Sequence, residues 1–343
     1  MRILVVGGYG LIGSAIVARL HAEGHDVVGA GRAIAAARRR APAVRWIEAD
    51  LGKATIENWG RHLDGIEAVV NCAGALQDGG RDNLRAVHVD GVARLLKACE
   101  HRGVTRFVHI SAAGLAPGRG AGFNDTKLMS EALIEASSLD WLILRPALVI
   151  GPAAYGGTAL LRGLAAFPFV IPSIYPASLV QVVAIEDVAQ AVSRSLGTEV
   201  PVRVRYDLAH REVHRLDHIL KRLRSWLGLP EAPVLALPAW LGRITAATGD
   251  LLGLLGWRSS LRTTALEQLR QGVRGDPSAA ETILDLRFRS LGEMLMRWPS
   301  GVQERWFGKS YFLKPLMVTV LAVFWTLSGV IGLTAGRGRR PRS

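Results

Sequence analysis

The chain has 343 residues, 49% hydrophobic and 21% charged, which permits a large buried core and excludes a disordered chain. Its two cysteines, Cys72 and Cys99, lie in no CxxC motif or Cys/His cluster, so the sequence predicts neither a disulfide framework nor a metal site. The net charge of +13 suits an anionic partner, a phosphorylated cofactor or an anionic membrane face, although a solvated basic surface explains it equally well. No nucleic-acid motif accompanies the charge, so we expect no nucleic-acid partner.

The first half of the chain alternates strand-like and helix-like segments, which is typical of a parallel α/β sheet. It opens directly on a strand, so we expect no secretory signal. The expected strands cover residues 2–6, 26–30, 44–48, 68–72, 106–111 and 141–145, and the expected helices cover 11–23, 84–101 and 127–137. Short links between such elements favour a doubly wound Rossmann sheet.

The second half reads differently, as a smaller and mostly helical part on the substrate side. Residues 151–176 are rich in glycine, proline and aromatics and show weak periodicity. We expect a strand and then a helix over 180–194, a strand over 203–208, and apolar helix-length segments over 213–227 and 235–255. The expected division is a nucleotide-binding domain over 1–150, a substrate-side part over 151–300, and a membrane helix with a basic tail over 301–343.

Residues 312–335 predict one hydrophobic C-terminal helix. The twenty residues from 316 to 335 carry no formal charge, and as a helix they span roughly 30 Å, the thickness of the hydrocarbon core of a bilayer. Lys309 and Lys314 flank one end, and four arginines follow the other. We therefore expect a membrane location, with a buried core helix as the alternative. Cofactor use would place the nucleotide-binding domain on the cytoplasmic side. Arg297 and Arg305 also precede the helix, so four basic residues flank each end and leave the topology open.

A glycine motif, GGYGLIG at residues 7–13, stands where the first strand turns into the first helix. In such a turn Gly7 permits the bend, Gly10 lets the backbone approach a pyrophosphate, and Gly13 lets the helix pack on the strand. The start of the helix also offers free amides to phosphate oxygens. A dinucleotide site is therefore predicted, the alternative being a glycine-rich turn without a ligand.

The end of the second strand bears on the choice of dinucleotide. An NAD site commonly has a carboxylate there, whereas this chain has Arg32, which can pair with a 2′-phosphate. The sequence thus favours NADP, while NAD stays open and Arg32 is alternatively a surface arginine.

Taken together, six short segments in order resemble the short-chain dehydrogenase/reductase superfamily in its extended or atypical branch. They are GGYGLIG at 7–13, Asp50-Leu51, NCAG at 71–74, VHIS at 108–111, LRP at 144–146 with GP at 151–152, and IEDVA at 185–189. The resemblance implies a role in catalysis for Ser111 and Lys127, although a strand-end cap and a solvated helix lysine are their alternatives. With the glycine turn, it assigns these residues to the cofactor: Gly7, Tyr9, Gly10, Leu11, Ile12, Gly13, Arg32, Asp50, Leu51, Ala73, Gly74 and Lys127.

The chain departs from the family at the catalytic tyrosine of its YxxxK motif. Phe123 stands four residues before Lys127, and a phenyl ring has no proton to donate. Three outcomes follow: another acid such as His88, Tyr155 or Tyr175 replaces the tyrosine, hydride passes to an acceptor that needs no protein acid, or the nucleotide is bound without turnover.

The C-terminal part looks like that of bacterial reductase-like proteins with a DoxX-like membrane module, of which this chain would keep only the first helix. The segments that carry this likeness are 257–259, 303–307 and 311–315. The segment 235–257 is either a lid or core helix or an amphipathic helix on the bilayer surface. A cleft beside lipid suits a lipophilic small molecule such as a quinone, an isoprenoid or a fatty acyl compound, and a membrane-protein partner is also compatible.

Two functions remain after this reading. The first is a membrane-anchored NAD(P)H-dependent oxidoreductase. The second is a catalytically silent nucleotide-binding structural or assembly protein, which would resemble the Rossmann-type accessory subunit of respiratory complex I.

Overall fold

A seven-stranded, fully parallel sheet forms the centre of the protein in a computed structural model, which describes residues 1–79, 83–116, 122–254 and 262–337. The strand order is β11-β6-β5-β4-β1-β2-β3. From β1 the chain adds β2 and β3 on one side and then β4, β5, β6 and β11 on the other, as in a doubly wound fold. The expected Rossmann fold, with a helical C-terminal part and a long apolar C-terminal helix, is therefore confirmed. The strands are β1 (Arg2–Val6), β2 (Asp26–Gly31), β3 (Arg45–Glu48), β4 (Ala68–Asn71), β5 (Arg106–Ile110), β6 (Asp140–Pro146) and β11 (Val204–Leu208).

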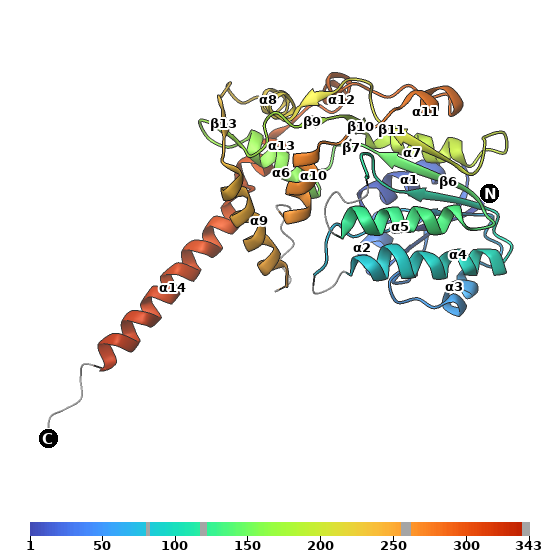
Figure 1. The fold of residues 1–343 in the computed structure, drawn as a ribbon, viewed down its shortest axis with the longest axis horizontal. Helices are drawn as coiled ribbons and strands as arrows, with labels where there is room; N and C mark the ends of the chain where they lie inside the picture. The colour runs from blue at the N-terminus through green and yellow to red at the C-terminus, as the bar shows by residue number, and fades with distance from the viewer. Residues whose placement is uncertain (80–82, 117–121, 255–261, 338–343) are drawn as a thin grey trace.

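Helices cover both faces of this sheet (Figure 1). Side chains alternate along each strand, so Ile3 and Val5 pack on one face while Leu4 and Val6 pack on the other. The first face is covered by α1 (Leu11–Ala22), α2 (Ala35–Arg40) and α7 (Ile185–Ser195). The second is covered by α3 (Ile56–His62), α4 (Gly91–His101), which a π-helical turn η1 (Ala86–Asp90) precedes, and α5 (Phe123–Glu135).

The second half builds a smaller core of its own around helices and short strands. Residues 151–176, for which no helix was expected, contain α6, which is amphipathic and buries its leucines against α8. The helix is short and contains glycines, so the sequence does not show a clear 3.6-residue hydrophobic period there. The helices are α6 (Gly156–Ala165), α8 (Leu216–Trp226), α9 (Ala239–Leu254), α10 (Thr263–Gln271), α11 (Ser278–Ile283), α12 (Leu291–Arg297) and α13 (Val302–Ser310), and the paired strands are β7 (Leu148–Ile150), β8 (Ile171–Ser173), β9 (Leu179–Val180), β10 (Val182–Ala184), β12 (His214–Arg215) and β13 (Val234–Ala236).

The last helix, α14 (Leu313–Arg337), projects away from the rest of the protein (Figure 1). The helical run Val302–Gly332 is long and apolar enough to cross a membrane, and the most apolar part of it buries no residue inside the protein. A core helix buries its apolar face, so the expected alternative of a buried core helix does not fit α14. Segment 257–259, part of the likeness to a DoxX-like module, and three arginines of the tail, Arg339, Arg340 and Arg342, lie outside the described residues.

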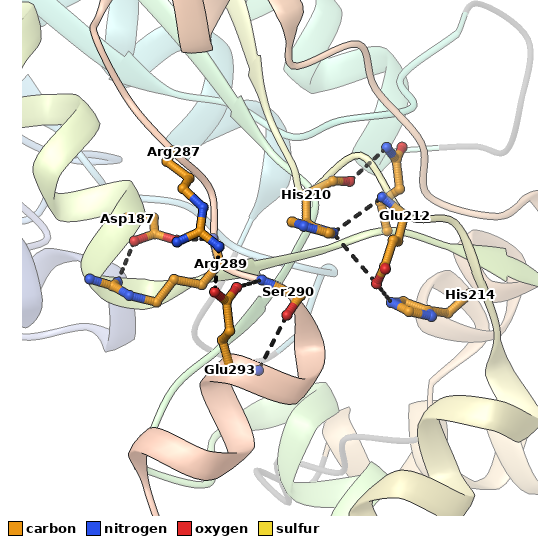
Figure 2. A network of polar contacts seen from close by, with 9 residues as sticks. Asp187, His210, Glu212, His214, Arg287, Arg289, Ser290 and Glu293 are labelled. Carbon is orange, nitrogen blue, oxygen red and sulfur yellow. Dashed lines mark hydrogen bonds and ion pairs between the residues drawn. The ribbon is translucent and has the colours of Figure 1, made fainter.

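A buried ion pair ties α7 to the segment that precedes α12 (Figure 2). The Asp187 carboxylate, with 3% of its side chain exposed, accepts hydrogen bonds from the Arg289 backbone amide at 2.8 Å and from the Arg289 guanidinium. Nearby, Arg287 pairs with Glu293 at the surface, where 82% of the Arg287 side chain is exposed. The two pairs share a region of the fold but differ in burial.

This difference predicts unequal costs for breaking the two pairs. Asp187→Asn leaves the Arg289 cation without its counter-charge and should lower the free energy of unfolding by about 2–3 kcal/mol. Arg287→Gln removes a solvated pair and should lower the free energy of unfolding much less than Asp187→Asn does. Urea denaturation of the full chain in mild detergent, followed by circular dichroism, measures both. Equal losses would contradict the assignment of Asp187 as the structural link.

Candidate functional site

The glycine turn is built from backbones that approach too closely to admit side chains. Gly7 has a φ of +76°, and its amide and that of Gly8 donate to the Ala30 carbonyl at 2.9 and 3.2 Å. A Cβ on Gly7 would lie 2.8 Å from the Ala73 nitrogen, and a Cβ on Gly13 would lie 2.3 Å from the Gly7 carbonyl oxygen. The turn therefore brings β1, the start of α1 and the loop after β4 into direct backbone contact.

The first turn of α1 leaves its amides available to an anion. Gly10 is the N-cap and has no side chain to accept from them. The amides of Leu11, Ile12 and Gly13 have no backbone acceptor outside the helix in the part of the chain that the structure describes. Free amides at the positive end of a helix dipole fit a pyrophosphate, so the residues present are compatible with a dinucleotide.

The edge beside this turn carries the other predicted cofactor residues. The Tyr9 ring covers the Cα of Gly31, where a Cβ would lie 2.0 Å from Tyr9 Cε1, and Arg32 follows directly. Asp50 comes after β3, and its Oδ1 accepts from the Gly52 amide at 3.0 Å, while Leu51 is buried. These residues follow neighbouring strands of the sheet, and their contacts with a cofactor stay a prediction.

A buried amide and imidazole hold the loop that contains Ala73 and Gly74. Asn71 Oδ1 accepts from the Ala73 amide at 3.1 Å, and Asn71 Nδ2 lies 3.2 Å from His109 Nδ1. Burial lowers the pKa of His109 well below its ordinary value, so the imidazole is neutral and its Nδ1 can accept from the Asn71 amide. The pair thus sets the position of the loop against Gly7.

Lys127 reaches the same place from α5. Its Nζ donates to the Ile110 carbonyl at 2.9 Å and would lie 3.7 Å from a Cβ on Gly74. Burial lowers the pKa of Lys127 to about 8, although Glu131 and Cys72 act in the opposite direction. Lys127 is therefore a buried cation near neutral pH beside the predicted cofactor loop, and the solvated lysine considered from the sequence is wrong.

His88 is fully occupied by its neighbours. Its Nε2 accepts from the Ala75 amide at 3.0 Å, so its Nδ1 carries the proton and donates to Thr126 Oγ1 at 2.9 Å. The Thr126 hydroxyl in turn donates a hydrogen bond to the Gly122 carbonyl oxygen at 2.6 Å. Burial, with Lys127 nearby, lowers the pKa of His88 to about 3. His88 therefore does not fit the role of a replacement acid.

Ser111 is also held within the protein. Its hydroxyl donates to Glu131 Oε1, and the Glu131 carboxylate is in turn bound by the Arg145 guanidinium. Glu131 is 2% exposed, and the sequence analysis did not predict a role for it. The one feature of the sequence that could have indicated it is its position four residues after Lys127, one turn along α5. The catalytic role expected of Ser111 stays a prediction. In this structure the Ser111 hydroxyl donates its hydrogen bond to Glu131.

The position of the missing tyrosine lies among these groups. Phe123 is 9% exposed and packs edge-on against His88, with ring centroids 5.8 Å apart. Tyr155 is the N-cap of α6 and is 57% exposed, and Tyr175 lies between β8 and β9. The structure therefore brings Phe123, His88, Lys127 and Ser111 to one edge of the sheet without a phenol at the expected place.

The depressed pKa of Lys127 predicts a pH dependence of stability. Between pH 8 and the ordinary lysine value of 10.5, the unfolded chain binds a proton that the folded chain has released, so the free energy of unfolding rises with pH in this window. Compared with Lys127→Met, the wild-type protein should gain about 2 kcal/mol between pH 8 and pH 10. Denaturation of both proteins at several pH values measures the difference, and parallel profiles would refute the shift.

Known proteins share this fold and, over part of the chain, the sequence. An uncharacterized protein of Mycobacterium tuberculosis is 30% identical over 239 residues, which are 68% of this chain but only 24% of that protein. The photosystem II assembly factor Ycf39 of Synechocystis is 30% identical over 147 residues, 42% of this chain and 44% of that protein. The chain thus spans about a quarter of the length of the first of these relatives.

Solved structures agree on the fold at lower identity. WbmG of Bordetella bronchiseptica in complex with NAD has a TM-score of 0.65 and 20% identity, over 87% of this chain and 93% of that one. The UDP-glucose 4-epimerase of Thermotoga maritima with UDP-glucose has a TM-score of 0.67 and 17% identity, over 92% and 100%.

The family model described as the NAD dependent epimerase/dehydratase family matches residues 3–166. This range contains the glycine turn, the loop after β4, Ser111 and Lys127, and NAD(P) is the cofactor typical of the family. Residues 3–166 of the chain are therefore similar to the NAD dependent epimerase/dehydratase family.

Proposed function

We propose that this protein binds NAD(P) at a membrane and acts as a nucleotide-binding structural or assembly protein, without the tyrosine-dependent chemistry of its family. One observation carries the proposal. Phe123 occupies the tyrosine position, and the polar groups around it, Ser111, His88 and Lys127, are already hydrogen-bonded within the chain. A site that keeps its glycine turn, but in which none of Phe123, His88, Ser111 and Lys127 offers a free acid, is suited to hold a nucleotide rather than to transform a carbonyl or hydroxyl.

A relative supports the assembly role. Ycf39 of Synechocystis is named as a photosystem II assembly factor and shares 30% identity over 147 residues. An assembly protein acts through the surface that it presents to partner proteins, and bound nucleotide stabilises the domain that carries this surface. The partner we propose is accordingly another membrane protein.

Membrane attachment is the second element of the proposal. The exposed apolar α14 supports it, with the nucleotide-binding domain on the cytoplasmic side, where NAD(P) is available. The proposal does not depend on the likeness to a DoxX-like module, which stays a prediction. Helix α9 leaves Trp240 and Ile244 exposed, so its expected contact with the bilayer surface belongs to the same proposal.

Hydride transfer to an acceptor that needs no protein acid is the second function we consider. Lys127 favours it, because a buried cation beside Gly74 is suited to hold a cofactor ribose, and bound NAD(P)H would supply the hydride. A quinone or another lipophilic small molecule is the acceptor compatible with a membrane location.

Purified full-length protein should distinguish the two functions. We expect NADPH or NADH to bind and to raise the unfolding temperature, while a panel of quinones and carbonyl compounds leaves the bound NADPH unoxidised. Phe123→Tyr restores the phenol four residues before Lys127 and should produce measurable carbonyl reduction, and Phe123→Leu serves as the control without a hydroxyl. Absence of nucleotide binding would overturn the proposal, and wild-type oxidation of NADPH by a quinone would favour the oxidoreductase.

We also propose a preference for NADP over NAD, based on Arg32. The strand β2 ends at Gly31 without a carboxylate, and a guanidinium in the next position suits a 2′-phosphate. Arg32→Glu should therefore weaken NADPH binding by about tenfold or more and leave NADH binding as strong or stronger. Arg39→Glu changes the same charge on the exposed end of α2 and is the control. Equal affinities for NADPH in wild type and Arg32→Glu would contradict the preference.

A further inference from the structure

A groove lies at the point where α13 meets α14. Its volume is about 450 Å³. Helix α13 packs against α6 at the root of α14 (Figure 1), and a Cβ on Gly308 would lie 2.9 Å from Ala166 Cβ. Gly308 is buried in that contact, whereas the groove residues on α13 are largely exposed. The groove is lined by Val302, Arg305, Trp306, Lys309, Ser310 and Leu313.

Two cations on this groove have no counter-charge among the residues that the structure describes. Arg305 and Lys309 are four residues apart and therefore lie one turn apart on one face of α13. Within the described residues, no ion pair or hydrogen bond is recorded for either side chain. Glu304, the carboxylate on the same helix, accepts from the Gly301 amide at 2.7 Å and serves as the helix cap. The groove thus carries a net positive charge that an external anion can neutralise.

The apolar part of the groove continues into the helix proposed to enter the membrane. Trp306 is 70% exposed, and Leu313 begins α14, whose following apolar side chains are exposed. Tryptophan beside lysine and arginine is typical of the level of lipid headgroups. The groove therefore has cations at its polar end and apolar side chains at the end nearest the acyl chains.

We propose that this groove binds the headgroup phosphate of an anionic phospholipid, with Arg305 and Lys309 contacting the phosphate and Leu313 the start of an acyl chain. The inference rests on the membrane attachment in the proposed function. An anionic lipid is favoured over a zwitterionic one because two unneutralised cations meet a lipid whose net charge is negative, and guanidinium pairs strongly with phosphate. The lipid would fix the angle at which α13 and the domain above it meet the bilayer.

The test compares two charge-matched double variants of the full-length protein in detergent. Arg305→Gln/Lys309→Gln removes the two cations of the groove. Arg39→Gln/Arg40→Gln removes two exposed cations from α2, which lies on the seven-stranded sheet and not at the groove. Native mass spectrometry counts bound phosphatidylglycerol and phosphatidylcholine, and a titration with each lipid gives its dissociation constant. Inorganic phosphate, added at the concentration of the lipid, is the competing probe.

We expect one phosphatidylglycerol to bind the wild type and the α2 variant, with affinity at least tenfold lower in the groove variant and weak phosphatidylcholine binding in all three. Equal binding of both lipids, an unchanged affinity in the groove variant, or displacement by inorganic phosphate would each overturn the proposal. The lipid is presented in detergent and no nucleotide is added. This result therefore depends neither on insertion into a bilayer nor on nucleotide binding. Alkaline extraction of native membranes tests the attachment itself, so the two failures are distinguishable.

Discussion

The contact between the backbones of Gly7, Gly13 and Ala73 is the constraint on which the rest of the site depends. A Cβ at Gly13 would lie 2.3 Å from the Gly7 carbonyl oxygen, and one at Gly7 would lie 2.8 Å from the Ala73 nitrogen. Only glycine permits such approaches, and they let α1 start directly above β1. Gly10, the N-cap in the same turn, has no side chain to accept from the first amides of α1, so the close packing of the turn and its free amides both depend on glycine.

Behind the turn, buried polar side chains bind one another and the backbone of the loops. Asn71 and His109 position the loop after β4, His88 joins Ala75 to Thr126, and Glu131 joins Ser111 to Arg145. Each of these groups would be costly to bury without its partner. Phe123 has no proton to donate, yet the hydrogen bonds among these neighbouring groups are complete without a phenol at its position.

The C-terminal part is connected to this site through α6. Arg162 is buried on α6, donates to the carbonyls of Gly151 and Pro152, and stacks over the Trp226 ring. Helix α6 also contacts α13, and Phe167 packs edge-on against Phe312, which directly precedes α14. The segment that follows β7 and the root of the protruding helix therefore rest on the same short helix, so a shift of one would be transmitted to the other through packed side chains.

The sequence by itself determined the features that depend on local pattern. Buried runs of strand residues predict the Rossmann sheet, and the spacing of Gly7, Gly10 and Gly13 predicts the glycine turn. Twenty uncharged residues before the tail predict the long apolar helix. Each of these patterns lies within continuous segments of the chain. The tertiary structure alone decided which polar groups are free. Glu131 reaches Ser111 across twenty residues and His88 reaches Thr126 across thirty-eight, and such pairings depend on how strands and helices assemble. Helix α6 likewise could not be predicted from its own glycine-rich sequence, because its stability depends on burial against α8 and α13.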